Sequence, residues 1–292
     1  MMKIVEKIEY TTPDGKTFSF HNPPSRAVTE ITGWGEPVKN FDTARGAYQH
    51  GEFVLAAWLQ PRDISFGFRY QGTSRDAYWE MRERLNNLLR VSRSDILNPV
   101  PGTLTRTLSN GQRRSLTVVL ESGLAYNPPA QSSWDEWSIF EILHFTAHDP
   151  VIFDPSGYSM APLTGFNAQA TQTRTIQYLG TWPEYPTLKI TGPTNGATIT
   201  ILETGYTLKL DYNIAAGEVV TIDMRYGKKT FISSTTGIVS GYIDIPNSDV
   251  GLWALQPDPI VPDGVNRLQV STNSASSATK VEMDYYLRYE SI

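Results

Sequence analysis

Short runs of alternating hydrophobic and polar residues dominate this chain of 292 residues, and they predict a mainly β protein. The clearest run extends over residues 62–70. Its hydrophobic members fall on one side of the expected strand, at Ile64, Phe66, Phe68 and Tyr70. A strand with this pattern places one face in a core and leaves the other face to polar side chains.

Two pairs of such runs are separated by turn sequences and predict β-hairpins. The first pair, residues 4–10 and 17–20, flanks Pro13-Asp14-Gly15. In the second pair, residues 102–108 and 113–120 flank Asn110-Gly111, which is the strongest hairpin signal in the chain.

Two further strands and one helix complete the expected first half. Residues 28–32 predict a short strand, and the apolar run 137–147 predicts a long strand deep in the sheet. Residues 74–91 predict a helix with Ser74 as its N-cap. Its hydrophobic side chains recur at helical spacing, at Tyr78, Met81, Leu85 and Leu88. We expect this single apolar stripe to lie on a sheet.

The second half contains short strands at regular intervals and predicts an all-β unit without helices. About eight strands are expected between residues 186 and 292, one of them at Val250–Leu255. Residues 156–182 show weak periodicity and many small polar residues, so we interpret them as a linker. The expected organisation is a β-sandwich-like domain with one packed helix over 1–155, and a β-sandwich or jelly-roll-like domain over 183–292.

Composition and charge exclude several classes of function. The chain has no cysteine, which excludes disulfides and thiolate chemistry. The net charge is −5 and neither half is basic, so tight binding of nucleic acid is not expected. No apolar run has the length of a signal peptide or a membrane span, and we expect a protein made in the cytoplasm without membrane insertion.

Candidate catalytic groups are sparse, and we interpret each of them structurally. His144 and His148 share a strand face but lie too far apart for one metal ion. Ser277 and Lys280 match a Ser–Lys spacing, yet they fall in a loop where the pattern needs a helix. The carboxylates Asp135, Glu136 and Glu141 form no convincing pair, and an arginine is the expected partner of Glu141. We therefore expect no enzyme activity, no cofactor and no metal.

The order of several short strings resembles the distal tail protein family of siphophages. The strings lie along nearly the whole chain: Gln49-His50-Gly51-Glu52, Arg62-Asp63-Ile64, His148-Asp149-Pro150 with Asp154-Pro155, residues 185–193, residues 217–223 and residues 280–285. The resemblance departs at His50, where an acidic residue is usual.

The resemblance implies a virion component of the phage tail tip. It implies a homo-hexameric ring that joins the tail tube protein to the tip hub protein, with DNA passing through the lumen as cargo. The second domain would then support receptor-binding proteins or side fibres. For assembly we expect an inter-subunit arm or belt within residues 26–52, with candidate contacts at Trp34, Phe41, Arg45 and Tyr48.

Two rival hypotheses concern the second domain and the carboxylates. Aromatic residues of the second domain form either its core or a platform for host-surface glycans, with Trp253 and Tyr286 as the candidate contacts. A carbohydrate-binding or adhesion-associated protein is the main alternative. The third hypothesis is a wall-degrading enzyme that depends on a carboxylate.

Overall fold

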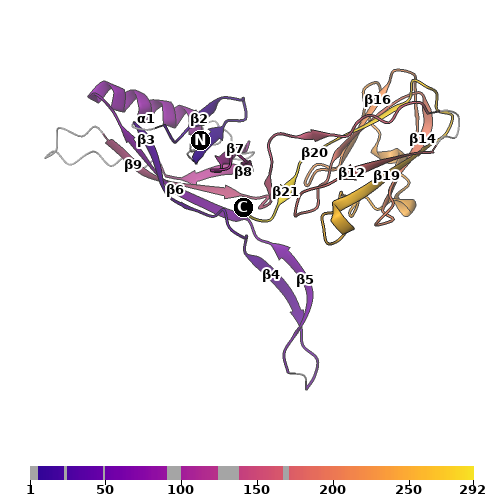
Figure 1. Ribbon diagram of the computed structural model, residues 1–292, viewed down its shortest axis with the longest axis horizontal. Coiled ribbons are helices and arrows are strands. Elements are labelled where there is room, and N and C mark those ends of the chain that lie inside the picture. Colours follow the sequence, from indigo (N-terminus) through magenta and orange to yellow (C-terminus); the bar gives the residue numbers. More distant parts are fainter. Residues whose placement is uncertain (1–5, 23–24, 49, 91–99, 124–137, 167–170) are drawn as a thin grey trace. The chain divides into compact units, whose positions relative to one another are not determined.

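The computed structural model describes residues 6–22, 25–48, 50–90, 100–123, 138–166 and 171–292 (Figure 1). The chain divides into two compact units. Unit 1 comprises Met1–Pro155 together with Glu290–Ile292, and unit 2 comprises Ser156–Tyr289. Strands predominate in both units, as the alternating pattern predicts.

Unit 1 is built on one antiparallel sheet. Its strand order is β2 (Thr17–Ser19), β1 (Lys7–Thr11), β7 (Gly102–Thr107), β8 (Arg113–Ser122), β9 (Ser138–Ala147), β6 (Arg62–Gln71) and β3 (Arg26–Thr32), and β10 (Ile152–Phe153) also pairs with β8. Residues 113–118 of β8 pair with β7, whereas residues 119–122 pair with β9, with a bulge between Leu120 and Ser122. Both predicted hairpins, β1–β2 and β7–β8, are confirmed.

Aromatic side chains fill the core of unit 1. Phe66 and Phe68 of β6 are fully buried and contact Phe20, with ring centroids 5.0 and 5.3 Å apart in edge-to-face geometry. The stacked ring of Phe145 on β9 lies 5.8 Å from Phe66. The alternation along β6 therefore buries the face that the sequence indicates.

The helix α1 (Arg75–Arg90) lies along this sheet and covers part of the core (Figure 1). The Ser74 hydroxyl accepts a hydrogen bond of 3.2 Å from the Ala77 amide, which confirms the predicted N-cap. The buried side chains of the helix are Tyr78, Arg82, Leu85 and Leu89. The predicted last residue, Val91, lies outside the described residues.

Strand β9 departs in part from the prediction. It lies inside the sheet between β8 and β6, but only one of its faces is covered. Phe140 and Ile142 point to the other face and are 57% and 46% exposed, and His144 on the same face is exposed as well. The apolar run therefore does not reflect burial of both faces within the unit.

Unit 2 is a β-sandwich. One sheet has the order β11 (Tyr158–Ser159), β20 (Lys280–Tyr285), β13 (Thr187–Thr191), β16 (Val219–Asp223), β17 (Thr230–Ser233) and β18 (Gly237–Ile238). The other has the order β12 (Thr171–Gln177), β19 (Val265–Thr272), β14 (Thr194–Ile201) and β15 (Thr207–Ile214). Two-residue β21 (Arg288–Tyr289) follows β20 in the chain, and the short 3-10 helices η2 (Ser240–Tyr242), η3 (Ile245–Asn247) and η4 (Pro262–Gly264) lie in its loops.

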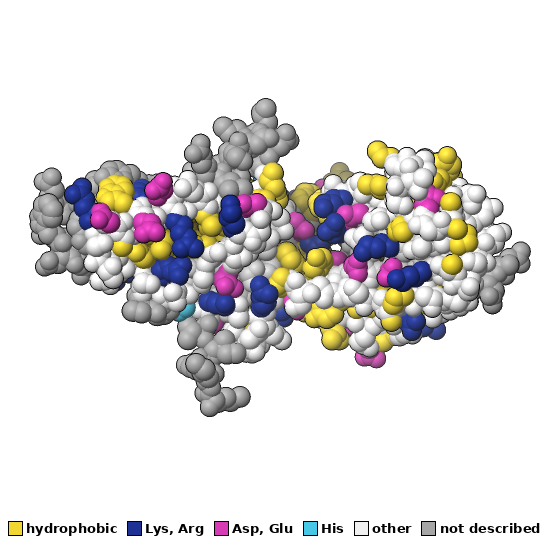
Figure 2. Space-filling view, turned by 90° about the horizontal axis from the view of Figure 1, so that it is seen from above, with side chains coloured by type: hydrophobic (Ala, Val, Ile, Leu, Met, Phe, Trp, Pro, Cys, Tyr) yellow, Lys and Arg dark blue, Asp and Glu magenta, His cyan; other side chains and the backbone are white. Residues whose placement is uncertain are grey.

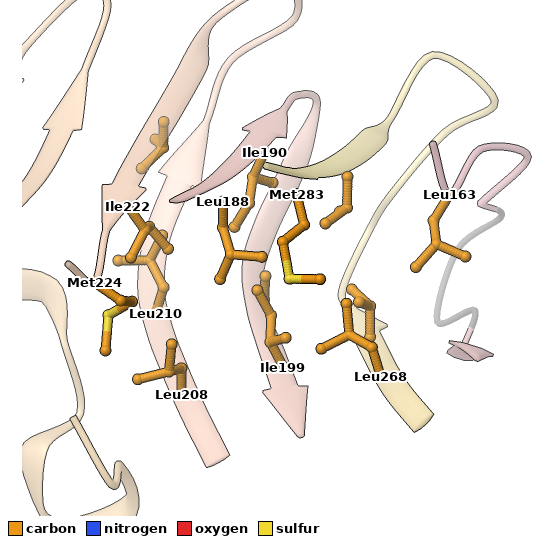
Figure 3. Close-up of a cluster of buried hydrophobic side chains, with 14 of the residues drawn as sticks. Leu163, Leu188, Ile190, Ile199, Leu208, Leu210, Ile222, Met224, Leu268 and Met283 are labelled. Carbon is orange, nitrogen blue, oxygen red and sulfur yellow. The ribbon is translucent and has the colours of Figure 1, made fainter. Parts of the chain in front are cut away.

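The core of unit 2 lies between its two sheets. Figure 3 shows Leu188, Ile190 and Met283 of one sheet beside Ile199, Leu208 and Leu268 of the other, and all six are buried. The side chains interdigitate in the way that two packed sheets require.

Two expectations for the second half are wrong. Residues 156–182 are no linker, because β11 and β12 belong to the two sheets and Leu163, Phe166 and Tyr178 are buried in the shared core. Residues 250–255 form a turn and an isolated bridge of Leu255 to Glu184 instead of a strand. In both segments, hydrophobic side chains on irregular backbone pack into the core. The spacing of hydrophobic residues does not distinguish such a segment from a strand.

Candidate assembly interface

The hairpin of β4 (Lys39–Ala44) and β5 (Phe53–Leu59) projects from unit 1 as a separate two-stranded sheet (Figure 1). We call residues 39–59 the arm. All six residues of β4 are exposed, and so are the first six of the seven in β5. The arm therefore receives almost no packing from the described part of its own chain.

The strand β5 presents apolar side chains to both faces of the arm, because its sequence is Phe-Val-Leu-Ala-Ala-Trp-Leu, whereas β4 is mostly polar. Cross-strand pairs place Trp58 beside Asn40 on one face, and Phe41 beside Ala57 on the other. A register shift between Asp42 and Thr43 marks a bulge that twists the arm. A strand with hydrophobic residues at every position is typical of a sheet buried on both faces. Here the same strand is uncovered, with Leu55 64% and Trp58 50% exposed.

The base of the arm is held by one buried guanidinium. Arg62 donates to the carbonyl oxygens of Gly33 and Pro150 at 2.9 Å, to that of Glu290 at 2.8 Å, and also to that of Gly35. Burial lowers the pKa of Arg62, while the negative charge of Glu290 opposes this effect. The planar fork of arginine suits several carbonyls at once, which the point charge of a lysine does not.

Further contacts fix the start and the end of the arm. The Gln60 amide donates to the Val38 carbonyl at 2.8 Å and closes the hairpin. The Lys39 ammonium lies 2.6 Å from the Glu290 carboxylate, and this hydrogen bond raises the pKa of Lys39. Gly33 has a φ of +86°, and a Cβ atom there would lie 2.1 Å from the Asp63 carbonyl oxygen. Only glycine is compatible with this close approach.

The structure brings three of the four candidate assembly residues onto the exposed arm. Phe41, Arg45 and Tyr48 are exposed, and Phe41 is 56% accessible. Trp34 requires a correction, because it is 3% exposed and belongs to the base of the arm instead of its surface. That these residues contact a neighbouring subunit stays a prediction.

The expected boundaries of the arm also require a correction. Residues 26–32 form β3 within the sheet, and the second strand of the arm, β5, lies beyond residue 52. The sequence signal for β5 is the run of seven apolar residues that follows Glu52. This run lacks the alternation on which the strand predictions relied.

The residues considered as catalytic candidates lie at separate places in the fold, and two of them form ion pairs. Glu141 is buried and lies 3.2 Å from the Arg82 guanidinium, so the expected pairing with an arginine is confirmed. Ser277 lies in a turn, and Lys280 begins β20 and pairs with Glu282 at 2.8 Å. Asp135 and Glu136 lie outside the described residues. Over the described ranges, three or more potential metal ligands do not gather at any point.

The candidate glycan contacts have different outcomes. Trp253 is fully buried, and its indole nitrogen donates to the Ile199 carbonyl at 3.2 Å, so this side chain is not available to a glycan. It is a core residue of the sandwich. Tyr286 is partly exposed and lines a groove on unit 2.

Charges of both signs are interspersed on the surface. On the face seen in Figure 2, Lys and Arg side chains lie beside Asp and Glu side chains over both units, without a patch of one sign among the coloured residues. Within the described ranges, the only helix of any length, α1, has too few residues and too many charges to cross a membrane.

Comparison with known proteins gives a likeness of fold. No family model and no curated protein matches the sequence. Among solved structures, the Dit protein of phage SPP1 aligns with a TM-score of 0.65 and 14% sequence identity. The alignment covers 98% of this chain and 99% of the SPP1 chain. That protein is described as a paradigm of the hub adsorption apparatus in phages that infect Gram-positive bacteria. A chain of the phage P2 baseplate in its activated conformation with calcium aligns with a TM-score of 0.57 and 9% identity over 99% and 100%. This chain therefore has the fold of phage Dit and baseplate proteins.

Proposed function

We propose that this protein is a structural subunit of a bacteriophage tail tip, and that six copies form a ring between the tail tube and the hub of the baseplate. The ring surrounds a lumen for the passing DNA, and its outer parts support host-adhesion components. The fold shared with the Dit protein of phage SPP1 and with phage P2 baseplate chains over nearly the full chain supports this proposal.

The observation that carries the proposal is the uncovered arm. An isolated two-stranded hairpin is marginally stable in water, and one with apolar side chains on both faces lacks the burial that would stabilise it. Burying its half-exposed side chains would contribute about 1 kcal/mol each. The arm of one subunit therefore packs on a neighbouring copy.

The form of this contact favours a ring over a two-fold dimer. An arm that inserts into a different surface of the next subunit makes a head-to-tail contact, which closes into a ring when the rotation permits. The rigid base supports the same role, because the hydrogen bonds of Arg62 fix the direction from which the arm leaves the sheet.

Negative-stain electron microscopy and native mass spectrometry of the purified chain test the proposal. The wild type is expected to give six-fold rings. A variant in which Asn-Gly replaces residues 39–59 is expected to be a folded monomer, because the backbone contact between Val38 and Gln60 already closes the gap.

A matched pair of triple variants separates the arm from general surface hydrophobicity. Phe53→Ser, Leu55→Ser and Trp58→Ser together should abolish the rings. The control set Tyr226→Ser, Ile238→Ser and Ile260→Ser removes three hydrophobic side chains of unit 2 that are as exposed or more exposed, and it should leave the rings intact. Rings that persist without the arm, or a wild type that stays monomeric at millimolar concentration, would contradict the proposal.

A further inference from the structure

A polar groove of about 430 Å³ lies on the surface of unit 2. It is formed by β11, the end of β20, β13 and the second residue after β16, all within this unit. The side chains that give it its character are Tyr158, Tyr286, Glu184, Asp284, Lys189 and Arg225. Its volume falls within the range of about 300–1,000 Å³ that is usual for small-molecule sites.

Aromatic rings line the groove at β11 and at the end of β20. Tyr158 stacks on Tyr285 with 5.7 Å between ring centroids and 25° between planes, and it remains 38% exposed. The Tyr286 ring lies near Gly157 in the turn before β11, where a Cβ atom on Gly157 would be 3.6 Å from the ring. The groove thus presents tyrosine rings whose hydroxyl groups both donate and accept hydrogen bonds.

The charged side chains in the groove are held in fixed positions by partners. Asp284 accepts hydrogen bonds from Lys189 at 2.8 Å and from the Ser159 hydroxyl at 2.6 Å. Two parallel bonds of 2.8 and 2.6 Å join Arg225 to Asp223. Glu184 is 2% exposed and accepts a bond of 3.1 Å from the Tyr286 amide. Preorganised polar groups of this kind lose little side-chain entropy when a ligand binds.

The chemistry of the lining defines the class of ligand. Each charge in the groove has a partner of opposite sign, because Asp284 pairs with Lys189, Arg225 with Asp223, and Glu184 with Arg288, so the groove has no excess of either sign. It offers donors, acceptors and aromatic rings close together. A neutral sugar matches this set, because its hydroxyl groups donate to carboxylates and accept from cations while its C–H face packs on a tyrosine.

We propose that this groove binds a neutral oligosaccharide. Tyr158 supplies the stacking surface, and Asp284 and Lys189 bind adjacent hydroxyl groups of one sugar ring. This inference does not depend on the arm or on ring formation, since every lining residue belongs to unit 2.

The test uses the full chain and an immobilised panel of neutral hexose, N-acetylhexosamine and deoxyhexose oligosaccharides, with acidic oligosaccharides as the comparison. The strongest neutral binder is then titrated by calorimetry. Tyr158→Ala and Asp284→Asn are each expected to weaken binding about tenfold or more, whereas Tyr158→Phe retains the ring and most of the affinity.

Tyr242→Ala is the matched control. Tyr242 is also a partly exposed tyrosine of unit 2 that contacts another tyrosine, Tyr212, at 5.0 Å, but it lies outside the groove. This variant should bind as the wild type does, and the melting temperatures of all variants verify that they are folded. Absence of binding to every neutral oligosaccharide, preference for acidic ones, or equal losses in the Tyr242 and Tyr158 variants would overturn the proposal.

Discussion

At the residue scale, Arg62 connects parts of unit 1 that are far apart in the chain. Its guanidinium is buried and donates to carbonyl oxygens of the segment before the arm, of the loop after β9, and of Glu290. Removal of the side chain takes away a buried donor that these carbonyl oxygens share. An unsatisfied buried acceptor costs about 1–3 kcal/mol.

Arg62→Met is therefore expected to destabilise unit 1 by about 3 kcal/mol or more. Differential scanning calorimetry should show a lower transition temperature for unit 1 and an unchanged transition for unit 2. Arg113→Met, at an exposed position of β8, is the control and should change stability by less than about 0.5 kcal/mol. Equal effects of the two substitutions would show that the carbonyl contacts contribute little.

Glu218 is a buried carboxylate in the turn between β15 and β16. Burial alone would raise its pKa, but hydrogen bonds from Ser233, from the Ala215 amide at 2.8 Å and from the Tyr212 hydroxyl at 2.8 Å outweigh it, and the pKa lies below the ordinary value of 4.5. A group with a lowered pKa in the folded state stabilises the protein above its unfolded pKa. This contribution is lost as the pH falls through the folded pKa.

Glu218→Gln is expected to cost about 1–3 kcal/mol at pH 7, because a charged acceptor of three hydrogen bonds becomes a neutral amide. The difference between wild type and variant should shrink as the pH is lowered from 5 to 3. Urea unfolding of both proteins across this range measures it. A difference that stays constant with pH would show that the charge of Glu218 is not the source of the effect.

Single buried residues were the hardest features to predict. The alternation of β6 predicted four buried side chains, since neighbouring residues define the face of a strand. Trp34 and Trp253 have no such pattern around them. Trp253 packs against residues that are distant in sequence, and its indole N–H donates a hydrogen bond to the carbonyl oxygen of Ile199. Local sequence carries little information about contacts of this kind.

At the element scale, one buried ion pair joins α1 to the sheet. The Arg82 guanidinium and the Glu141 carboxylate lie 3.2 Å apart, with both side chains about a tenth exposed. Burial of two charges is costly, and the geometry of the pair offsets this cost. Loss of only one partner removes this ion pair and leaves the other charge buried between the helix and β9.

Arg82→Met alone is therefore expected to destabilise unit 1 by about 3–5 kcal/mol. The double variant Arg82→Met with Glu141→Leu should be more stable than that single variant, because neither charge remains. Chemical unfolding of the single and double variants completes the cycle. A double variant that is less stable than both singles would contradict this account.

Elements with turn chemistry were predicted well, and elements without it were not. Pro13-Asp14-Gly15 and Asn110-Gly111 specify tight turns, and the hairpins around them are present. β5 has no polar residue to alternate with its apolar ones, and nearly all of its residues are exposed. Residues 250–255 also lack alternation, and a short apolar run of this kind does not distinguish a strand from irregular backbone packed in a core. The strand β12 was missed because most of its residues are polar. Its exposed face consists of Thr and Gln, so the sequence shows almost no hydrophobic alternation.

At the scale of the whole molecule, unit 1 is assembled from two distant parts of the chain. Residues 290–292 belong to unit 1 although all of unit 2 precedes them. The Glu290 carbonyl accepts a bond of 2.8 Å from Arg62, and its carboxylate pairs with Lys39 at the base of the arm. Residue 290 therefore contributes to the contacts at the base of the arm.

Removal of residues 290–292 is expected to lower the stability of unit 1 by about 1–3 kcal/mol and to leave unit 2 unchanged. Calorimetry of the truncated and full chains gives both values. Glu290→Gln is the informative comparison, because it retains the carbonyl contact with Arg62 and weakens only the pairing with Lys39. A loss confined to unit 2 would show that these residues belong energetically to the other unit.

The return of residues 290–292 to unit 1 also sets an order of events during protein synthesis. The ribosome releases these residues only after the whole of unit 2 has been made, whereas independent domains usually complete their folding in the order of synthesis. The contacts of Glu290 with Arg62 and Lys39 at the base of the arm cannot form until residues 290–292 have been synthesised. The contacts at the base of the arm therefore form last during translation. A product that ends before residue 290 has the apolar hairpin but lacks the contacts of Glu290 with Arg62 and Lys39.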